Sequence, residues 1–268
     1  MAGVEDFFTR LRANATSWGR DLSAAGAFLT ILPVPAPPAT GGRKAAKPPV
    51  SAVRAFPVIG TGVGIIAGAA LMVGSDLGLH PMASALVALA VAAALTGGLH
   101  EDGLADTADG LGGGRTAAAR LKVMQDSRIG SFGALAIVFS VAIRAAILAG
   151  FATPGIAVLA LIAAGAASRG AMSAVMVAIP TARRQGLAAT FGRPAREDSV
   201  TGALLGGAMA LLCLGPLGGV LAVALAAVTA FALARLAKRH LGGYTGDVLG
   251  AVQQACEIAV LLGAVAIG

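Results

Sequence analysis

A short stretch near the middle of the chain gathers acidic side chains at high density. Residues 97–114, GGLHEDGLADTADGLGGG, place four carboxylates within nine positions, although the whole chain of 268 residues has thirteen Asp and Glu. The four are Glu101, Asp102, Asp106 and Asp109. If residues 101–110 are helical, the three aspartates have i, i+4, i+7 spacing and share one face, where their charges repel. Such a face favours the binding of a cation.

The ligand types in this segment indicate which cation would bind. Carboxylate oxygens with no cysteine and one neighbouring imidazole, that of His100, suit a hard ion such as Mg²⁺, which keeps waters and bridges to substrate phosphates. One acid, or His100, could instead accept a proton from a hydroxyl group, because neighbouring negative charges raise a carboxyl pKa. The alternative interpretation is an acid-rich loop that solvent alone stabilises.

A second segment, QDSRIGSFG at residues 125–133, adds Asp126, Ser127 and Arg128. Arg128 could bind a phosphate, and Ser131 with the glycine amides could assist at a helix N-terminus. The alternative is a basic membrane anchor followed by a helix cap.

A third segment, GGYTGDVLGAVQQACEIAVLL at residues 242–262, places Asp247 at the start of an apolar stretch and Glu257 within it. Acids at membrane depth are costly and usually functional. Asp247 is the better candidate for the site, whereas Glu257 could pair with an arginine inside another span, either Arg144 or Arg169. For both arginines, ion pairing and substrate binding stay open.

The composition indicates an integral membrane protein that positions these segments. The chain is 57% hydrophobic and 12% charged, with a mean hydropathy of +0.83, which excludes an ordinary soluble domain. Its 38 glycines and 4% aromatic content suit helices that approach closely through small residues, as the spacing of Gly60, Gly64 and Gly68 illustrates. The net charge of +7 does not indicate nucleic acid, because the basic residues lack neighbouring aromatic side chains for base stacking.

We predict an all-α, polytopic membrane bundle that forms one domain over residues 1–268. Residues 1–56 are expected to form an amphipathic, interfacial N-terminal segment with a basic, proline-rich linker at 36–49, and residues 57–268 the bundle. The apolar residues 22–34 are too short to span and predict an interfacial or re-entrant helix. Seven spans of membrane-crossing length are predicted: 57–76, 82–99, 130–151, 155–179, 199–214, 217–236 and 247–267.

The basic residues predict the orientation of the bundle. Eighteen of the 20 Lys and Arg fall before residue 55 or within 115–128, 183–196 and 235–239, whereas the loops at 77–81, 152–154 and 215–216 have none. The positive-inside rule then predicts a multi-pass protein of the inner (plasma) membrane with a cytoplasmic N-terminus and acidic segment. Arg183, Arg184 and Arg193 could also meet a polyanionic substrate, although topology alone accounts for them.

The three segments together resemble the cobalamin synthase family, the adenosylcobinamide-GDP ribazoletransferases. The resemblance rests on GGLHEDGLADTADGLGGG, then MQDSRIGSFGALA and LGGYTGDVLGA in that order, with FPVIGTGVG at residues 56–64 as the first span. It implies a Mg²⁺-dependent enzyme that transfers the phosphocobinamide group of adenosylcobinamide-GDP to the 5'-hydroxyl of α-ribazole or its 5'-phosphate and releases GMP. Membrane lipid is the expected surrounding, and a homo-oligomer stays open.

The resemblance also distributes roles among the candidate residues. Asp102, Asp106 and Asp109 are expected to hold the metal and pyrophosphate, with Glu101 as ligand or supporting partner. His100 is a further candidate base. The expected substrate-binding residues are Asp126, Ser127, Arg128 and Asp247.

Two other functions stay open from the sequence. A CDP-alcohol-type lipid phosphotransferase also places aspartates at a membrane face, but the chain lacks the DGxxAR pattern of that family. An ion-coupled transporter would use intramembrane charges such as Asp247 and Glu257. It is disfavoured because the acids are densest outside the spans.

Overall fold

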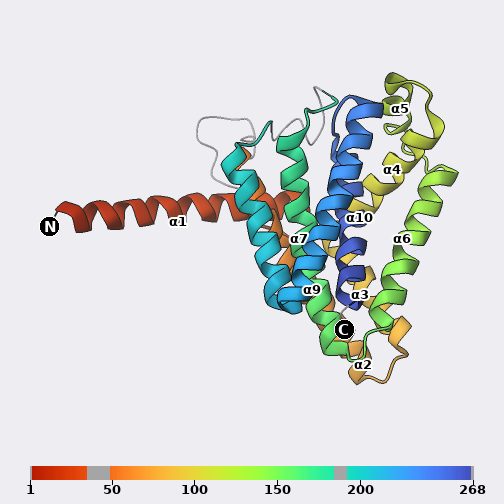
Figure 1. The fold of residues 1–268 in the computed structure, drawn as a ribbon, viewed down its shortest axis with the longest axis horizontal. Helices are drawn as coiled ribbons and strands as arrows, with labels where there is room; N and C mark the ends of the chain where they lie inside the picture. The colour runs from red at the N-terminus through yellow and green to blue at the C-terminus, as the bar shows by residue number, and fades with distance from the viewer. Residues whose placement is uncertain (1, 35–48, 184–191, 267–268) are drawn as a thin grey trace.

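The computed structural model describes residues 2–34, 49–183 and 192–266, with side chains from residue 14 onward, and this part of the chain is helical (Figure 1). The all-α prediction is confirmed. Arg184 lies outside these residues, as does the whole of the expected linker at 36–49 except Pro49. The elements are α1 (Ala2–Leu29), the 3-10 helix η1 (Val50–Ala55), α2 (Phe56–Asp76), α3 (Pro81–Thr96), α4 (Leu99–Gly113), α5 (Ala117–Val123), α6 (Ser131–Ala149), α7 (Pro154–Ala178), α9 (Arg196–Leu241) and α10 (Gly246–Val265).

Among the described residues, five helical stretches are long and apolar enough to cross a membrane: residues 50–76, α6, α7, α9 and α10. The pair α3 and α4 makes a sixth candidate, bent by 90°. Because α4 carries four carboxylates, which hydrocarbon disfavours, we place the spanning part in α3 and α4 at the membrane–water boundary. The protein is therefore a multi-pass membrane protein.

The long helix α9 is broken where two separate spans were expected. Gly215, with φ 70° and ψ 175°, is not helical, and Pro216 follows it. The two limbs then pack against each other, since a Cβ on Gly219 would lie 2.5 Å from the Cα of Leu211 and one on Gly207 would touch Val223. When the two limbs are counted as separate helices, each of the seven expected spans corresponds to a helix.

The predicted end of the second span, at residue 99, is wrong. The span expected at 82–99 ends at Thr96, because Gly97 and Gly98 both adopt left-handed backbone conformations, with φ 63° and 69°. Two such residues end α3 and turn the chain into α4, where the acidic segment begins.

Close contacts between glycines connect α2 to α7, as the small-residue spacing predicts. A Cβ on Gly60 would overlap the carbonyl of Gly165, and one on Gly64 would lie 2.7 Å from the Cα of Ile162. The two backbones therefore touch directly, which is how small residues join helices in a membrane.

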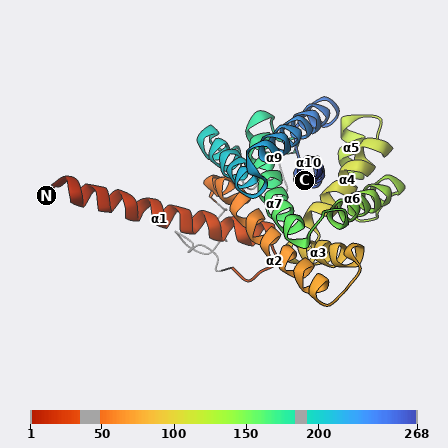
Figure 2. The ribbon, with the colours of Figure 1, turned by 60° about the horizontal axis from the view of Figure 1, so that its bottom comes forward.

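The N-terminal helix differs from its prediction. The apolar stretch 22–34 is not a helix of its own, because α1 runs from Ala2 and ends at Leu29. α1 extends away from the bundle, crosswise to the long helices (Figures 1 and 2). Its inner end is held to η1, where Arg54 Nε lies 2.6 Å from the buried carboxylate of Asp21 and the guanidinium covers the ring of Trp18. The interfacial position of this helix stays a prediction.

Candidate active site

The acidic helix α4 reaches α10 through a crossing of two glycines. A Cβ on Gly103 would lie 2.7 Å from the carbonyl oxygen of Asp247, and one on Gly250 would lie 3.1 Å from that of His100. A side chain at either position would separate the helices. The crossing brings Asp102 and Asp106 of α4 close to Asp247 at the start of α10.

Asp106 is the most perturbed carboxyl of this group, which we call the carboxylate cluster: Asp102, Asp106 and Asp247. Partial burial and then the charges of Asp102, Asp247 and Asp109 raise the pKa of Asp106 to about 6, against an opposing effect of Arg183. A carboxyl whose charge is disfavoured in this way gains most from a bound cation or a proton.

Asp247 is held by its own helix cap and by an arginine from a distant segment. The hydroxyl of Thr245 donates to Asp247 Oδ2 at 3.1 Å and accepts from the amide of Val248 in the first turn of α10. Arg183 Nη1 lies 3.7 Å from the same Oδ2. The carboxylate cluster thus has one cationic side chain at its edge.

A β-bridge places Arg183 there. Tyr244 donates its amide to the carbonyl of Pro180 at 2.9 Å, and the amide of Ala182 donates back to Tyr244 at 2.8 Å. Arg183 and Thr245 were missing from the expected site. The signal for Arg183 was its place in a basic segment, but no local pattern indicates the pairing between residues 180–182 and 244.

Asp109 contacts the start of α6. Its Oδ2 accepts the amide of Gly130 at 2.7 Å and its Oδ1 that of Gly133 at 2.9 Å. A Cβ on either glycine would overlap this carboxylate, so the two glycines of RIGSFG are what allow the approach. Asp109 satisfies free amides and the positive end of the α6 dipole, as an acidic helix cap does.

The second candidate segment forms a local ion pair. Arg128 donates from Nε and Nη2 to the two carboxylate oxygens of Asp126, at 3.0 and 2.8 Å. The hydrogen bonds from Arg128 lower the pKa of Asp126 to about 2. Ser127 is exposed beside them. Arg128 therefore has an exposed carboxylate partner, which a phosphate could replace. The binding of a substrate phosphate by Arg128 stays a prediction.

Below the carboxylate cluster lies a buried polar network that joins three helices. Arg144 Nη1 of α6 lies 3.0 Å from Glu257 Oε1 of α10, and Arg144 Nη2 lies 3.6 Å from Glu101 Oε1 of α4. Gln254 donates to Glu101 at 3.0 Å, and Gln253 donates to Glu257. The hypothesis that Glu257 pairs with an intramembrane arginine is confirmed.

Glu101 and His100 lie in or beside this network and not at the surface. Glu101 accepts a hydrogen bond from Gln254 and lies 3.6 Å from Arg144 Nη2, whereas the neighbouring Asp102 is exposed. His100 is 1% exposed and lines the same narrow cavity as Arg169, and its Nε2 has no partner among the described residues. These positions favour a supporting role for both residues.

The carboxylate cluster suits Mg²⁺ by the chemistry of its donors. Across the described residues, three or more His, Cys, Asp or Glu do not converge into a cage for a metal ion. Mg²⁺ is usually held by one or two carboxylates together with substrate phosphates. Two adjacent carboxylates of α4, with the charge repulsion seen at Asp106, fit that mode of binding better than an all-protein site.

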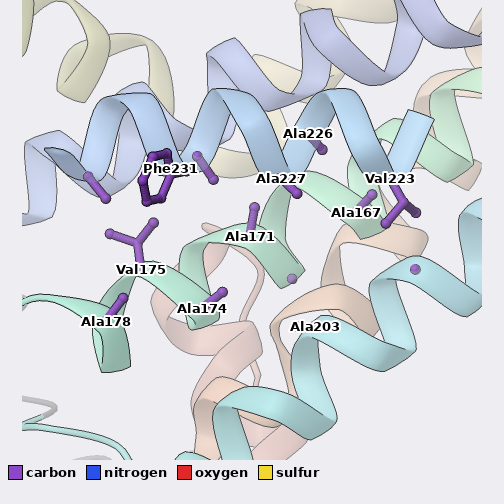
Figure 3. A pocket seen from close by; sticks show the side chains of 14 residues that line it. Ala167, Ala171, Ala174, Val175, Ala178, Ala203, Val223, Ala226, Ala227 and Phe231 are labelled. Carbon is purple, nitrogen blue, oxygen red and sulfur yellow. The ribbon is translucent and has the colours of Figure 1, made fainter. Parts of the chain in front are cut away.

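A large cavity lies away from this site. It has a volume of about 280 Å³ and is formed by α7 and both limbs of α9. Its walls are alanines, glycines, valines and Phe231, without a hydrogen-bonding side chain (Figure 3). Such a lining offers no group for acid, base or phosphate chemistry.

The fold and the site define a multi-pass helical membrane protein whose carboxylate cluster lies where α4 crosses α10. The chain belongs to the cobalamin-5-phosphate synthase family, whose model matches residues 21–265.

Curated relatives agree with this assignment. The adenosylcobinamide-GDP ribazoletransferase of Azorhizobium caulinodans is 45% identical over 91% of this chain and 94% of its own length. Those of Bradyrhizobium diazoefficiens and Rhizobium etli are 44% and 43% identical, over 92% and 90% of the chain and 93% and 94% of their own lengths. No solved structure matches the chain.

Proposed function

We propose that this protein catalyses the adenosylcobinamide-GDP ribazoletransferase reaction, a final step of cobalamin assembly. The observation that carries the proposal is the convergence of Asp102 and Asp106 with Asp247 and Arg183, in a chain that matches the family over residues 21–265. Phosphoryl transfer depends mainly on positioning and neutralisation of charge: Arg183 supplies positive charge, and the carboxylates would hold a cation that supplies more.

The reaction breaks the pyrophosphate bond of the donor and forms a phosphate ester with the ribazole. A ribose hydroxyl of the ribazole attacks the phosphorus nearest the cobinamide, the bond from this phosphorus to the GMP oxygen breaks, and GMP leaves. The hydroxyl proton passes to a carboxylate of the cluster. An acceptor that already carries a 5'-phosphate has no free 5'-hydroxyl, so the expected attack by the 5'-hydroxyl is wrong for that acceptor. A product that keeps its 5-phosphate, as the family description states, requires a secondary hydroxyl.

Mg²⁺ is the proposed cofactor, and Asp102 and Asp106 are the residues that would hold it. When bound, the ion would neutralise charge on the pyrophosphate and polarise its oxygens. Arg183 supplies a further positive charge at the cluster's edge. Asp109 is proposed as a positioning residue, since both its oxygens accept amides at the start of α6.

We also infer that the carboxylate cluster faces the cytoplasm. The turns after α2 and α6 lie at one end of the bundle, and α5 with the start of α10 lies at the other (Figure 1). The basic segments 115–128 and 235–239 belong to the end with the cluster, and the positive-inside rule supports a cytoplasmic placement for that end.

The test is release of GMP from adenosylcobinamide-GDP by the purified full chain in detergent, with α-ribazole 5'-phosphate and with or without Mg²⁺. We expect Mg²⁺-dependent release matched by cobamide formation, and its loss in Asp106→Asn. Asp76→Asn, an exposed acid at the far end of α2, is the matched control and should keep full activity. Folded wild-type protein that releases no GMP with both substrates present would overturn the proposal.

A further inference from the structure

A second cavity with basic walls lies next to the carboxylate cluster. It has a volume of about 300 Å³ and is lined by Met176 near the end of α7, by residues 179–181 and 183, by residues 192–193 and by Tyr244. The β-bridge between Thr181 and Tyr244 fixes one side of it. The cavity and the cluster therefore share a wall, which the bridge builds.

The side chains around this cavity suit an anion. Arg183 and Arg193 both line it, and no acidic side chain among the described residues does. Arg183 reaches Asp247 from the same position, at 3.7 Å, so it connects the cavity to the carboxylate cluster. Arg193 is exposed, and its Nη2 donates to the carbonyl of Val177 at 3.2 Å, which leaves other guanidinium donors for a ligand. Arginine side chains are a common means of binding phosphate.

The rest of the lining suits a nucleoside more than a free inorganic ion. Met176 and Ile179 provide an apolar wall, and Tyr244 is 1% exposed, with a hydroxyl that has no partner among the described residues. A volume of about 300 Å³ is at the lower end of the usual range for small-ligand pockets. A corrin ring is far too large for it, whereas a single nucleotide is of suitable size.

We propose that this cavity is a nucleoside monophosphate subsite, with the phosphate bound by Arg183 and Arg193 and the nucleoside against Met176 and Ile179. The inference rests on the proposed function, because both reactants carry such a group. One source is the GMP portion of the donor, and the other is the phosphorylated ribazole acceptor. In either case Arg183 spans from the subsite to the carboxylate cluster, where the pyrophosphate reacts.

The experiment measures equilibrium binding of GMP and, separately, of α-ribazole 5'-phosphate to the purified full chain, without turnover. Arg193→Gln should weaken binding of one of the two probes about tenfold, the usual effect of losing a charge-assisted hydrogen bond. Arg193→Lys should restore part of the loss. Arg196→Gln, an exposed arginine three residues away that does not line the cavity, should bind both probes as the wild type does.

The probe that responds identifies the source. If GMP binding weakens, Arg193→Gln should also raise the KM for the donor with either acceptor. If α-ribazole 5'-phosphate binding weakens, the KM for this acceptor should rise, while that for unphosphorylated α-ribazole stays constant. Unchanged binding of both probes in a folded Arg193→Gln protein would overturn the subsite. Arg193-dependent binding by a chain that never turns over would support the subsite and overturn only the proposed reaction.

Discussion

Arg144 of α6 pairs with Glu257 of α10 at 3.0 Å, beneath the carboxylate cluster and out of contact with solvent. The same guanidinium lies 3.6 Å from Glu101 at the start of α4. One cation therefore joins the two helices that carry the cluster to a third helix. Removal of this cation would leave the carboxylates of Glu101 and Glu257 without their cationic partner.

We expect Arg144→Ala to lower stability strongly, because breaking one side of a buried ion pair typically costs about 3–5 kcal/mol. The measurement is the apparent Tm of the purified protein in detergent, beside Arg144→Lys, which keeps the charge. Arg235→Ala is the matched control, since its guanidinium lies over Phe231 on the exposed limb of α9. An Arg144→Ala protein as stable as the control would show that the network contributes little.

Asp106→Asn should remove activity while preserving or raising stability. The substitution relieves repulsion from Asp102 and Asp247 and takes away a charge that burial disfavours, and the site loses a ligand at the same time. We expect a fall in turnover of about a hundredfold or more. Wild-type protein should gain thermal stability from added Mg²⁺ and lose that gain with a chelator, as binding linkage requires. The same Mg²⁺ response in Asp106→Asn would remove Asp106 from the metal site.

Asp109→Ala should lower stability and keep the response to Mg²⁺, which is the reverse of the effects expected for Asp106→Asn. It takes two hydrogen bonds from the amides of Gly130 and Gly133, so we expect a loss of about 1–3 kcal/mol and a lower apparent Tm. Because we propose a positioning role, the stabilisation by Mg²⁺ should persist. Gly133→Ala gives an independent check, since its new Cβ would overlap the Asp109 carboxylate and lower the Tm similarly. Loss of the Mg²⁺ response with an unchanged Tm would instead make Asp109 a metal ligand.

The helices and the acidic segment were predictable from the sequence because both depend on local patterns. Apolar runs of spanning length and proline or glycine boundaries are visible in the chain, and the break at Gly215 was expected beside Pro216. The turn at Gly97 and Gly98 was missed, since two glycines within an apolar run do not reveal a left-handed backbone.

The site contacts depend on long-range packing, which one sequence does not show. Asp109 and the amides it binds are 21 and 24 residues apart, and Arg183 reaches Asp247 only through the bridge between Thr181 and Tyr244. Helical periodicity groups Asp109 with Asp102 and Asp106. The Asp109 carboxylate nevertheless binds the start of α6, because the unsatisfied amides of that helix attract an acid.

The crossing of α4 and α10 should be the most sensitive point of the backbone. Gly103→Ala would place a Cβ 2.7 Å from the carbonyl oxygen of Asp247, which the backbone can avoid only if the two helices separate. Asp102 and Asp106 would then move away from Asp247, so we expect kcat to fall at least tenfold, because small displacements of catalytic groups are costly. Gly62→Ala is the matched control: its Cβ would meet nothing within 4 Å, and alanine favours the helix. GMP release and apparent Tm should be measured for both variants. If Gly103→Ala retains wild-type kcat, close contact between these two helices is not what assembles the carboxylate cluster.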